Sequence, residues 1–286
     1  MTTTAAQEAF LQDFHAEHPA VTSEAFGGGR APDGRSSYEI LCGRVQGSRR
    51  VLDLGCGDGL LLEYLARSDG RQLAGVDLSP QSLALARRRP ALAGVRLEEG
   101  RAQELPFPDD SFDACVSHLA LMLMGEIEHV VAEVARVLSP GGVLAYVVGG
   151  GAVGGEAYER FLGLLRRTVE EMPASRRIPP LGDSRTRSRD GLDEILVPAG
   201  FGAADWETIP IDLSGPVEQV WAALSGLYDL GPLDRTTVER LRKAFFAEVR
   251  EMTTPDGRVP CAYKIRVATA RMRERAAQAS PPVGAA

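Results

Sequence analysis

The stretch that most constrains this chain is residues 51–65, VLDLGCGDGLLLEYL. A short apolar run ends at Leu54, glycines follow at 55, 57 and 59, and leucines then recur at helical spacing. This order predicts a buried strand, a tight glycine turn and a helix, which together open a doubly wound α/β sheet. Glycine suits such a turn because it reaches backbone angles that a side chain blocks and lets a ligand approach the main chain.

The same stretch resembles the first motif of class I S-adenosylmethionine-dependent methyltransferases, D-x-G-x-G-x-G, with Asp53 as its acid. The rival dinucleotide-binding fingerprint, G-x-G-x-x-G, requires a third glycine where this chain has Leu60, and it does not account for Asp53. The turn LSPGG before residue 143 is also similar to the family. Within the class, the chain looks most like menaquinone- and ubiquinone-type small-molecule C-methyltransferases. The resemblance covers residues 36–148 well and residues 190–270 more loosely.

The resemblance implies a doubly wound, mostly parallel, seven-stranded Rossmann-like sheet with an antiparallel last strand and a helical lid. Apolar patterning predicts strands near residues 51–54, 72–76, 95–97, 112–117, 143–148, 206–211 and 262–268. We therefore expect five segments along the chain. They are an N-terminal lid segment (1–35), a cofactor-binding core (36–148), a helical lid insertion (149–190) that opens on a glycine-rich linker, the end of the core with inserted lid helices (191–272), and a disordered tail (273–286).

Composition narrows the choice of partners. The net charge of −7 argues against nucleic acid, because neutralising phosphates needs a basic surface. The four cysteines are scattered singly and show no metal-ligand spacing, so we expect reduced thiols, no bound metal and a cytoplasmic protein. The first ten residues lack the pattern of a signal peptide, and no apolar run reaches about 18 residues, which predicts no membrane partner. A small-molecule substrate is expected, and a homodimer is left open.

The expected cofactor is S-adenosyl-L-methionine. Asp77 ends the second strand, about twenty residues after the glycine turn, where α/β nucleoside sites place the carboxylate that accepts both ribose hydroxyls. The resemblance implies that the glycine turn holds the methionine portion, that Asp53 lies near its ammonium group and that Leu78 flanks adenine. The full set of expected cofactor-binding residues is Asp53, Gly55, Cys56, Gly57, Asp77, Leu78, Ala102, Gln103 and Ser117.

One residue departs from the family pattern. The segment EEGRAQELPF closely resembles the family's G-D-A-x-x-L-P-F, whose acid usually binds the adenine amine, but Arg101 stands at that position. An arginine cannot accept a proton from an amine. The contact must then come from elsewhere, with Gln103 as one candidate, or be absent, while the backbone amide of Ala102 can donate to a ring nitrogen.

Histidines are the candidate bases. His118 follows the fourth strand, beside the point where open α/β sheets bind ligands, and is the first candidate. Its structural alternative is a hydrogen bond to a loop carbonyl. His15 is a second candidate, and with His18 it could share one face of a lid helix, although an exposed polar pair is the more common outcome.

Arg30 and Arg35 lie in the glycine-rich loop of the N-terminal lid segment, where guanidinium groups could clamp a carboxylate, and Tyr38 could line the acceptor pocket. On this ground we favour C-methylation of a carboxylate-bearing 2-oxo acid in specialised metabolism. O-methylation of a natural-product hydroxyl and a non-methylating cyclisation are the alternatives. A nicotinamide-dependent oxidoreductase is disfavoured by Leu60.

Overall fold

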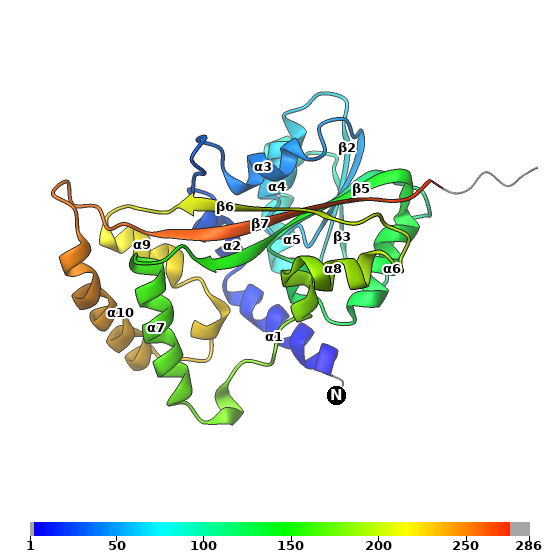
Figure 1. Ribbon diagram of the computed structural model, residues 1–286. Helices are drawn as coiled ribbons and strands as arrows, with labels where there is room; N and C mark the ends of the chain where they lie inside the picture. The colour runs from blue at the N-terminus through cyan, green and yellow to red at the C-terminus, as the bar shows by residue number, and fades with distance from the viewer. Residues whose placement is uncertain (1–2, 275–286) are drawn as a thin grey trace, which may run out of the picture.

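The computed structural model describes residues 3–274 and contains one seven-stranded sheet in the order β3-β2-β1-β4-β5-β7-β6 (Figure 1). β1 pairs in parallel with β2 and β4, while β7 is antiparallel to both β5 and β6. The predicted α/β sheet with an antiparallel last strand is thus confirmed. The strands are β1 (Arg50–Leu54), β2 (Gln72–Asp77), β3 (Arg96–Glu99), β4 (Phe112–His118), β5 (Leu138–Ala152), β6 (Asp205–Asp212) and β7 (Ala262–Arg271).

Ten α-helices are described in residues 3–274, and several begin where side-chain caps predict. Ser36 and Glu39 form a reciprocal capping box at the start of α3, and the Ser79 side chain accepts from the Ser82 amide at the start of α5. The helices are α1 (Thr3–Glu17), α2 (Val21–Phe26), α3 (Ser37–Gly43), α4 (Leu60–Ala66), α5 (Pro80–Ala86), α6 (Ile127–Val137), α7 (Ala157–Glu170), α8 (Arg189–Leu196), α9 (Val217–Leu224) and α10 (Arg235–Val249).

Two apolar clusters cover the two faces of the sheet. Strand residues alternate between them, so that Leu52 packs with α6 and α8 on one face while Val51 packs with α3, α4 and α5 on the other. A strand that is buried on both faces has a nearly continuous apolar sequence, which is why the sequence predicts a buried strand at residues 51–54. This arrangement leaves the carboxyl ends of the strands open for a ligand.

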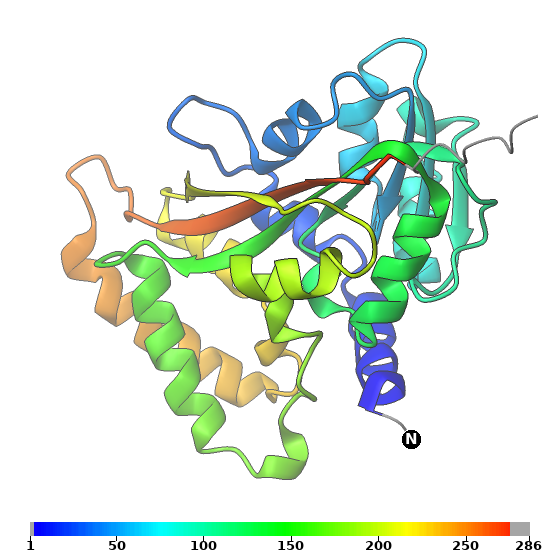
Figure 2. The ribbon, with the colours of Figure 1, turned by 45° about the vertical axis from the view of Figure 1, so that its right-hand side comes forward.

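A third apolar cluster joins α7, α9 and α10 into a helical unit beside β6 and β7. Figure 1 shows these helices gathered at one end of the molecule, and the turned view in Figure 2 keeps α7 and α10 side by side. Phe161, Trp221 and Phe245 meet there with ring centroids 5.8 Å apart in each pair. The unit therefore unites helices from two separately predicted lid segments, because each has an apolar stripe that the others bury.

The structure differs from the sequence expectation after residue 148. The expected glycine-rich linker does not begin at 149, because β5 continues to Ala152 with an irregularity between Gly149 and Gly151. β7 pairs with this extension and satisfies its backbone hydrogen bonds, which overrides the weak strand preference of glycine. The expected disordered tail lies outside the described residues from 275 onward, and the Arg273 amide still donates to the Gly200 carbonyl.

None of the helices within residues 3–274 combines the length and the apolar character that a bilayer span requires.

The third glycine of the turn, Gly59, sets how closely α4 packs on α5. It has φ +81° and forms the N-cap of α4. A Cβ at this position would lie 2.7 Å from Leu92 Cδ1 and 3.0 Å from Ala86 Cβ. Both the backbone angle and the packing therefore require glycine.

We expect Gly59→Ala to lower the free energy of unfolding by about 2–4 kcal/mol, because it adds left-handed strain to a packing clash. Gly70→Ala is a matched control, since Gly70 has φ +76° but open space around its Cβ position, and it should cost only about 1–2 kcal/mol. Urea denaturation measures both. Equal losses in the two variants would show that packing at Gly59 contributes nothing.

Candidate functional site

The glycine turn between β1 and α4 forms the floor of the main pocket. Gly55 and Gly57 have φ +74° and +52°, and both line the pocket with the buried Cys56 between them. A Cβ on Gly55 would lie 2.5 Å from Ala120 Cβ, whereas one on Gly57 would project into open space. The turn thus leaves a cradle beside the main chain that a side chain would fill.

Asp53 lies at the end of β1 with only 1% of its surface exposed, and its Oδ2 has no hydrogen-bond partner. Burial raises the pKa of this carboxyl well above its usual range, and the neighbouring Asp77 and Asp58 raise it further. A buried carboxylate without a cationic partner is costly. A positive group of a ligand in the cradle would lower this cost, because it would stabilise the ionised carboxylate.

Asp77 links the end of β2 to the glycine turn. Its Oδ2 accepts a hydrogen bond from the Gly57 amide at 2.7 Å, and its Oδ1 accepts one from the Ser79 amide at 2.8 Å. Burial raises its pKa, although these amide hydrogen bonds act in the opposite direction. A carboxylate has about four acceptor positions, so after the backbone amides of Gly57, Ser79 and Leu78 it keeps acceptor capacity for a ligand hydroxyl. The residue expected to bind ribose therefore also holds the glycine turn in place.

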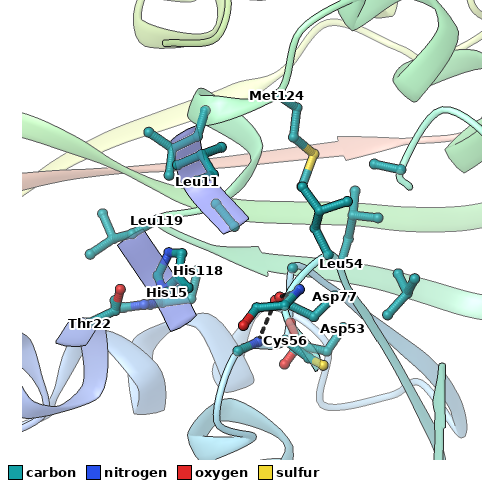
Figure 3. A pocket seen from close by; sticks show the side chains of 18 of the residues that line it. Leu11, His15, Thr22, Asp53, Leu54, Cys56, Asp77, His118, Leu119 and Met124 are labelled. Carbon is teal, nitrogen blue, oxygen red and sulfur yellow. Dashed lines mark hydrogen bonds between the residues drawn. The ribbon is translucent and has the colours of Figure 1, made fainter. Parts of the chain in front are cut away.

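Helix α1 closes the pocket from the opposite side. Glu8, Leu11, Gln12 and His15 recur at helical spacing and all line the pocket. Figure 3 shows Leu11 and His15 across the pocket from Asp53. This face of α1 was not predicted, because periodicity shows which residues share a face but not what that face covers.

His15 is not part of the exposed pair expected from the sequence. Its Nε2 lies 3.0 Å from the hydroxyl of Tyr228, which belongs to the segment between α9 and α10, and its buried Nδ1 has no partner. Burial lowers the pKa of His15, although the charge of Asp77 acts to raise it. His18 does remain exposed. The difference arises from a tertiary contact with Tyr228, which no local sequence pattern indicates.

His118 ends β4 and lines the pocket, as expected from its position. Its Nε2 lies 2.8 Å from Ser37 Oγ, its ring stacks on Tyr38 with centroids 3.9 Å apart, and its Nδ1 has no partner. Burial lowers the pKa of His118 to about 3, so the imidazole is neutral at physiological pH. Tyr38, the expected pocket residue, also lines the pocket.

The remaining expected cofactor residues divide into two groups. Leu78, Ala102 and Gln103 line the pocket beyond Asp77, and the Gln103 side-chain amide donates to the Gly125 carbonyl. Ser117 does not line it, because its hydroxyl donates to the Leu54 carbonyl and accepts from the Leu121 amide. In this structure Ser117 ties β1 to the segment after β4.

The two arginines expected to bind substrate lie outside the pocket lining. The Arg30 backbone pairs with Asp212 at the end of β6, and its guanidinium donates to the carbonyls of Gly27 and Gly29. The Arg35 guanidinium pairs with Asp33 at 2.6 Å on the surface. The attachment of the loop to β6 explains why neither guanidinium reaches the site.

In a comparison with known proteins, residues 52–146 match the model of the family described as "Methyltransferase domain". A fatty-acid O-methyltransferase of Mycolicibacterium smegmatis is 41% identical over 99 residues, which are 34% of this chain and 36% of that protein. A demethylmenaquinone methyltransferase of Thermus thermophilus is 40% identical over 99 residues, 34% of this chain and 45% of that protein. The similarity therefore spans less than half the length of these relatives. It confirms the resemblance to class I methyltransferases over the cofactor-binding half of the sheet.

Two solved structures share the fold over nearly the whole chain. A phosphoethanolamine N-methyltransferase 2 of Haemonchus contortus, in complex with phosphomonomethylethanolamine and S-adenosylhomocysteine, has a TM-score of 0.58 and 18% identity. The alignment covers 94% of this chain and 60% of that one. The [4+2]-cyclase SpnF has a TM-score of 0.56 and 21% identity, with 96% and 97% covered. At these identities the likeness shows the fold alone.

The raised pKa of Asp53 predicts a pH dependence of stability. Between the ordinary value of 3.8 and the higher folded value, the folded protein keeps a proton that the unfolded chain releases, so wild-type stability falls as pH rises. The variant Asp53→Asn has no carboxyl at this position and therefore lacks this fall in stability. We expect the difference in the free energy of unfolding, variant minus wild type, to grow by at least about 1 kcal/mol between pH ~4 and pH ~8.

Urea denaturation of the ligand-free protein at several pH values measures this difference. Asp69→Asn controls for the loss of one exposed carboxylate. A stability difference between Asp53→Asn and wild type that does not change with pH would contradict the assignment.

Proposed function

We propose that this chain is an S-adenosylmethionine-dependent methyltransferase that acts on a small molecule with an apolar body. The observation that carries the proposal is the unpartnered, buried Oδ2 of Asp53 beside the glycine cradle. Asp53 would hold the ammonium group, the turn the methionine portion, Asp77 the ribose and Leu78 the adenine. The methyltransferase-domain match and the S-adenosylhomocysteine in a structural neighbour support this cofactor.

The chain's own part in the reaction would be positioning and exclusion of water. When bound, S-adenosylmethionine would supply an electrophilic methyl group for in-line displacement, which depends on alignment and a dry site. Helix α1 covers the cradle through Leu11 and His15, and Tyr228 holds His15 in place. These contacts come from the N-terminal segment and the helical unit, so both would act as the lid.

The apolar acceptor follows from the lining of the pocket. Leu11, Leu119, Leu123 and Met124 contribute apolar side chains, and among the described residues that line the pocket Arg101 is the only arginine or lysine. Arg101 is already paired with Glu8. The pocket thus offers no unpaired guanidinium to a carboxylate, which removes the support for a 2-oxo acid that Arg30 and Arg35 had suggested. The name of the fatty-acid O-methyltransferase is in keeping with an apolar acceptor.

His118 would bind the acceptor rather than remove its proton. An efficient general base titrates near the operating pH, and a pKa near 3 makes this imidazole a weak base. Because Ser37 occupies Nε2, the unpartnered Nδ1 is left to exchange a hydrogen bond with the acceptor. The base role predicted from the sequence stays a prediction that the pH profile can test. The cytoplasmic location, the role in specialised metabolism and the homodimer also stay predictions.

The first test is mass spectrometry of reactions with methyl-labelled S-adenosylmethionine and a panel of fatty acids, phenolic and polyketide hydroxyls, and 2-oxo acids. We expect label on an apolar acceptor. Asp77→Ala should weaken S-adenosylhomocysteine binding roughly 100-fold or more, because it removes charged hydrogen bonds to the ribose. Label on a 2-oxo acid carbon would overturn the apolar assignment.

The same experiment separates the alternatives. Label on oxygen would identify an O-methyltransferase, and label on carbon a C-methyltransferase. If the cofactor binds tightly but the true substrate is converted without forming S-adenosylhomocysteine, the proposal fails in favour of non-methylating chemistry such as cyclisation. That alternative shares the fold, as the cyclase structure shows, and fold does not fix function.

The role of His118 has its own prediction. His118→Phe keeps the stacking on Tyr38 but removes the proposed hydrogen bond to the acceptor together with the one to Ser37. Since only the hydrogen bond to the acceptor acts directly on the substrate, we expect kcat/KM to fall about 3- to 10-fold. We expect no wild-type inflection in kcat/KM near pH 6.5, since the folded pKa is about 3. An inflection there that disappears in His118→Phe would establish the base role and contradict the hydrogen-bonding role.

A further inference from the structure

The loop after β3 marks the end of the pocket where the base of the cofactor would lie. A nucleoside whose ribose binds at the end of β2 extends its base along the carboxyl edge of the sheet, toward the next strand. That strand is β3, and the pocket residues around its end are Leu78, Gly100, Arg101, Ala102 and Gln103. Whatever recognises the base must therefore reach this end of the pocket.

The carboxylate of Glu8, on helix α1, lies at this end of the pocket, beside the loop after β3. Arg101 Nε lies 3.0 Å from both carboxylate oxygens of Glu8 on α1, and Arg101 Nη2 lies 2.9 Å from Oε1. Glu8 also lines the pocket. The other pocket-lining acids in residues 3–274 are Asp53, Asp58 and Asp77, which lie around the glycine turn and the end of β2.

The ion pair fixes the orientation of the Glu8 carboxylate. The planar guanidinium holds both oxygens at once, which limits how the carboxylate can rotate. The same Nη2 of Arg101 also lies 4.0 Å from Glu126 Oε2. The Arg101 side chain is 45% exposed and that of Glu8 21%, so the pair adds little to stability. Its main consequence is the position of the carboxylate.

We propose that Glu8 is a specificity-determining residue for the cofactor, and this proposal rests on the proposed function. Its carboxylate, held by Arg101, accepts a hydrogen bond from the exocyclic amine of adenine. Oε1 already accepts two N–H groups from Arg101, whereas Oε2 accepts only one and keeps a free acceptor position. Arg101 is then a positioning residue, and the acceptor that the loop lacks is supplied by the lid helix.

This arrangement couples recognition of the base to closure of the lid. Glu8 lies four residues before Gln12, whose side-chain amide donates to the Leu78 carbonyl, and seven before His15. All three lie on the face of α1 that lines the pocket. The adenine amine can therefore contact the Glu8 carboxylate only when α1 covers the pocket. A base without the amine would lose this contact with the lid.

Isothermal titration calorimetry of the full chain tests the proposal with two probes. One is S-adenosylhomocysteine, and the other is its analogue with hydrogen in place of the 6-amino group. We expect wild type to bind S-adenosylhomocysteine about 10- to 100-fold more tightly than the analogue, as for a hydrogen bond to a charged group. Glu8→Ala should weaken S-adenosylhomocysteine binding by about that factor and leave the affinity for the analogue within about 3-fold.

Two variants serve as controls. Glu17→Ala removes an exposed acid from the same helix, and Gln103→Ala removes the rival acceptor near the base. Both should keep the discrimination between the probes. Unchanged affinity for the analogue in Glu8→Ala also shows that this variant is folded and that its pocket is intact.

The outcomes are distinct. If Glu8→Ala weakens both probes equally, Glu8 acts only through the lid and the proposal is wrong. If Glu8→Ala still binds S-adenosylhomocysteine more tightly than the analogue, or if Gln103→Ala loses this difference in affinity, another group binds the amine. The proposal is then also wrong. If wild type binds neither probe, the proposed function itself fails, which separates the two failures.

Discussion

The carboxylate of Asp77 is the interaction on which the rest of the site depends. It joins the end of β2 to the turn after β1 through the amides of Gly57 and Ser79, so two neighbouring strands share one anchor. The anchor fixes the cradle next to Asp53. Burying these two acids costs free energy: burial raises the pKa values of both, and the charge of Asp77 raises that of Asp53 further. A cationic, hydroxyl-bearing ligand would offset this cost.

Part of the pocket around this anchor is closed by segments from outside the first half of the sheet. α1 lies over the pocket, Tyr228 from the helical unit holds His15, and Gln7 on α1 donates to the Pro180 carbonyl. The N-terminal segment thus contacts both later insertions. Residues from the N-terminal helix α1, from the first half of the sheet and from the segment between α9 and α10 therefore line one pocket, although they are far apart in sequence.

Local patterns were good predictors of some residues and poor predictors of others, for physical reasons. Gly55, Gly57 and Asp77 were identified because strand ends and glycine turns have local signatures, and the structure places all three at the pocket. Arg30 was misleading because its loop pairs with β6, a contact between residues far apart in the chain. His15 looked like an exposed residue because its partner, Tyr228, lies more than two hundred residues away.

The sequence by itself determined the strands of the sheet and the glycine turn after β1. These features follow from hydrophobic period, glycine positions and acids at strand ends, all of which act over a few residues. The antiparallel last strand was implied by the resemblance to class I methyltransferases, and the structure confirms it. Only the tertiary structure decided which groups line the pocket beside His118 and at the loop after β3. The neutral state of His118 arises from its burial beside Tyr38, and the carboxylate beside Arg101 comes from Glu8, 93 residues earlier in the chain. Such pairings depend on how α1 packs across the sheet, and no local pattern encodes that packing.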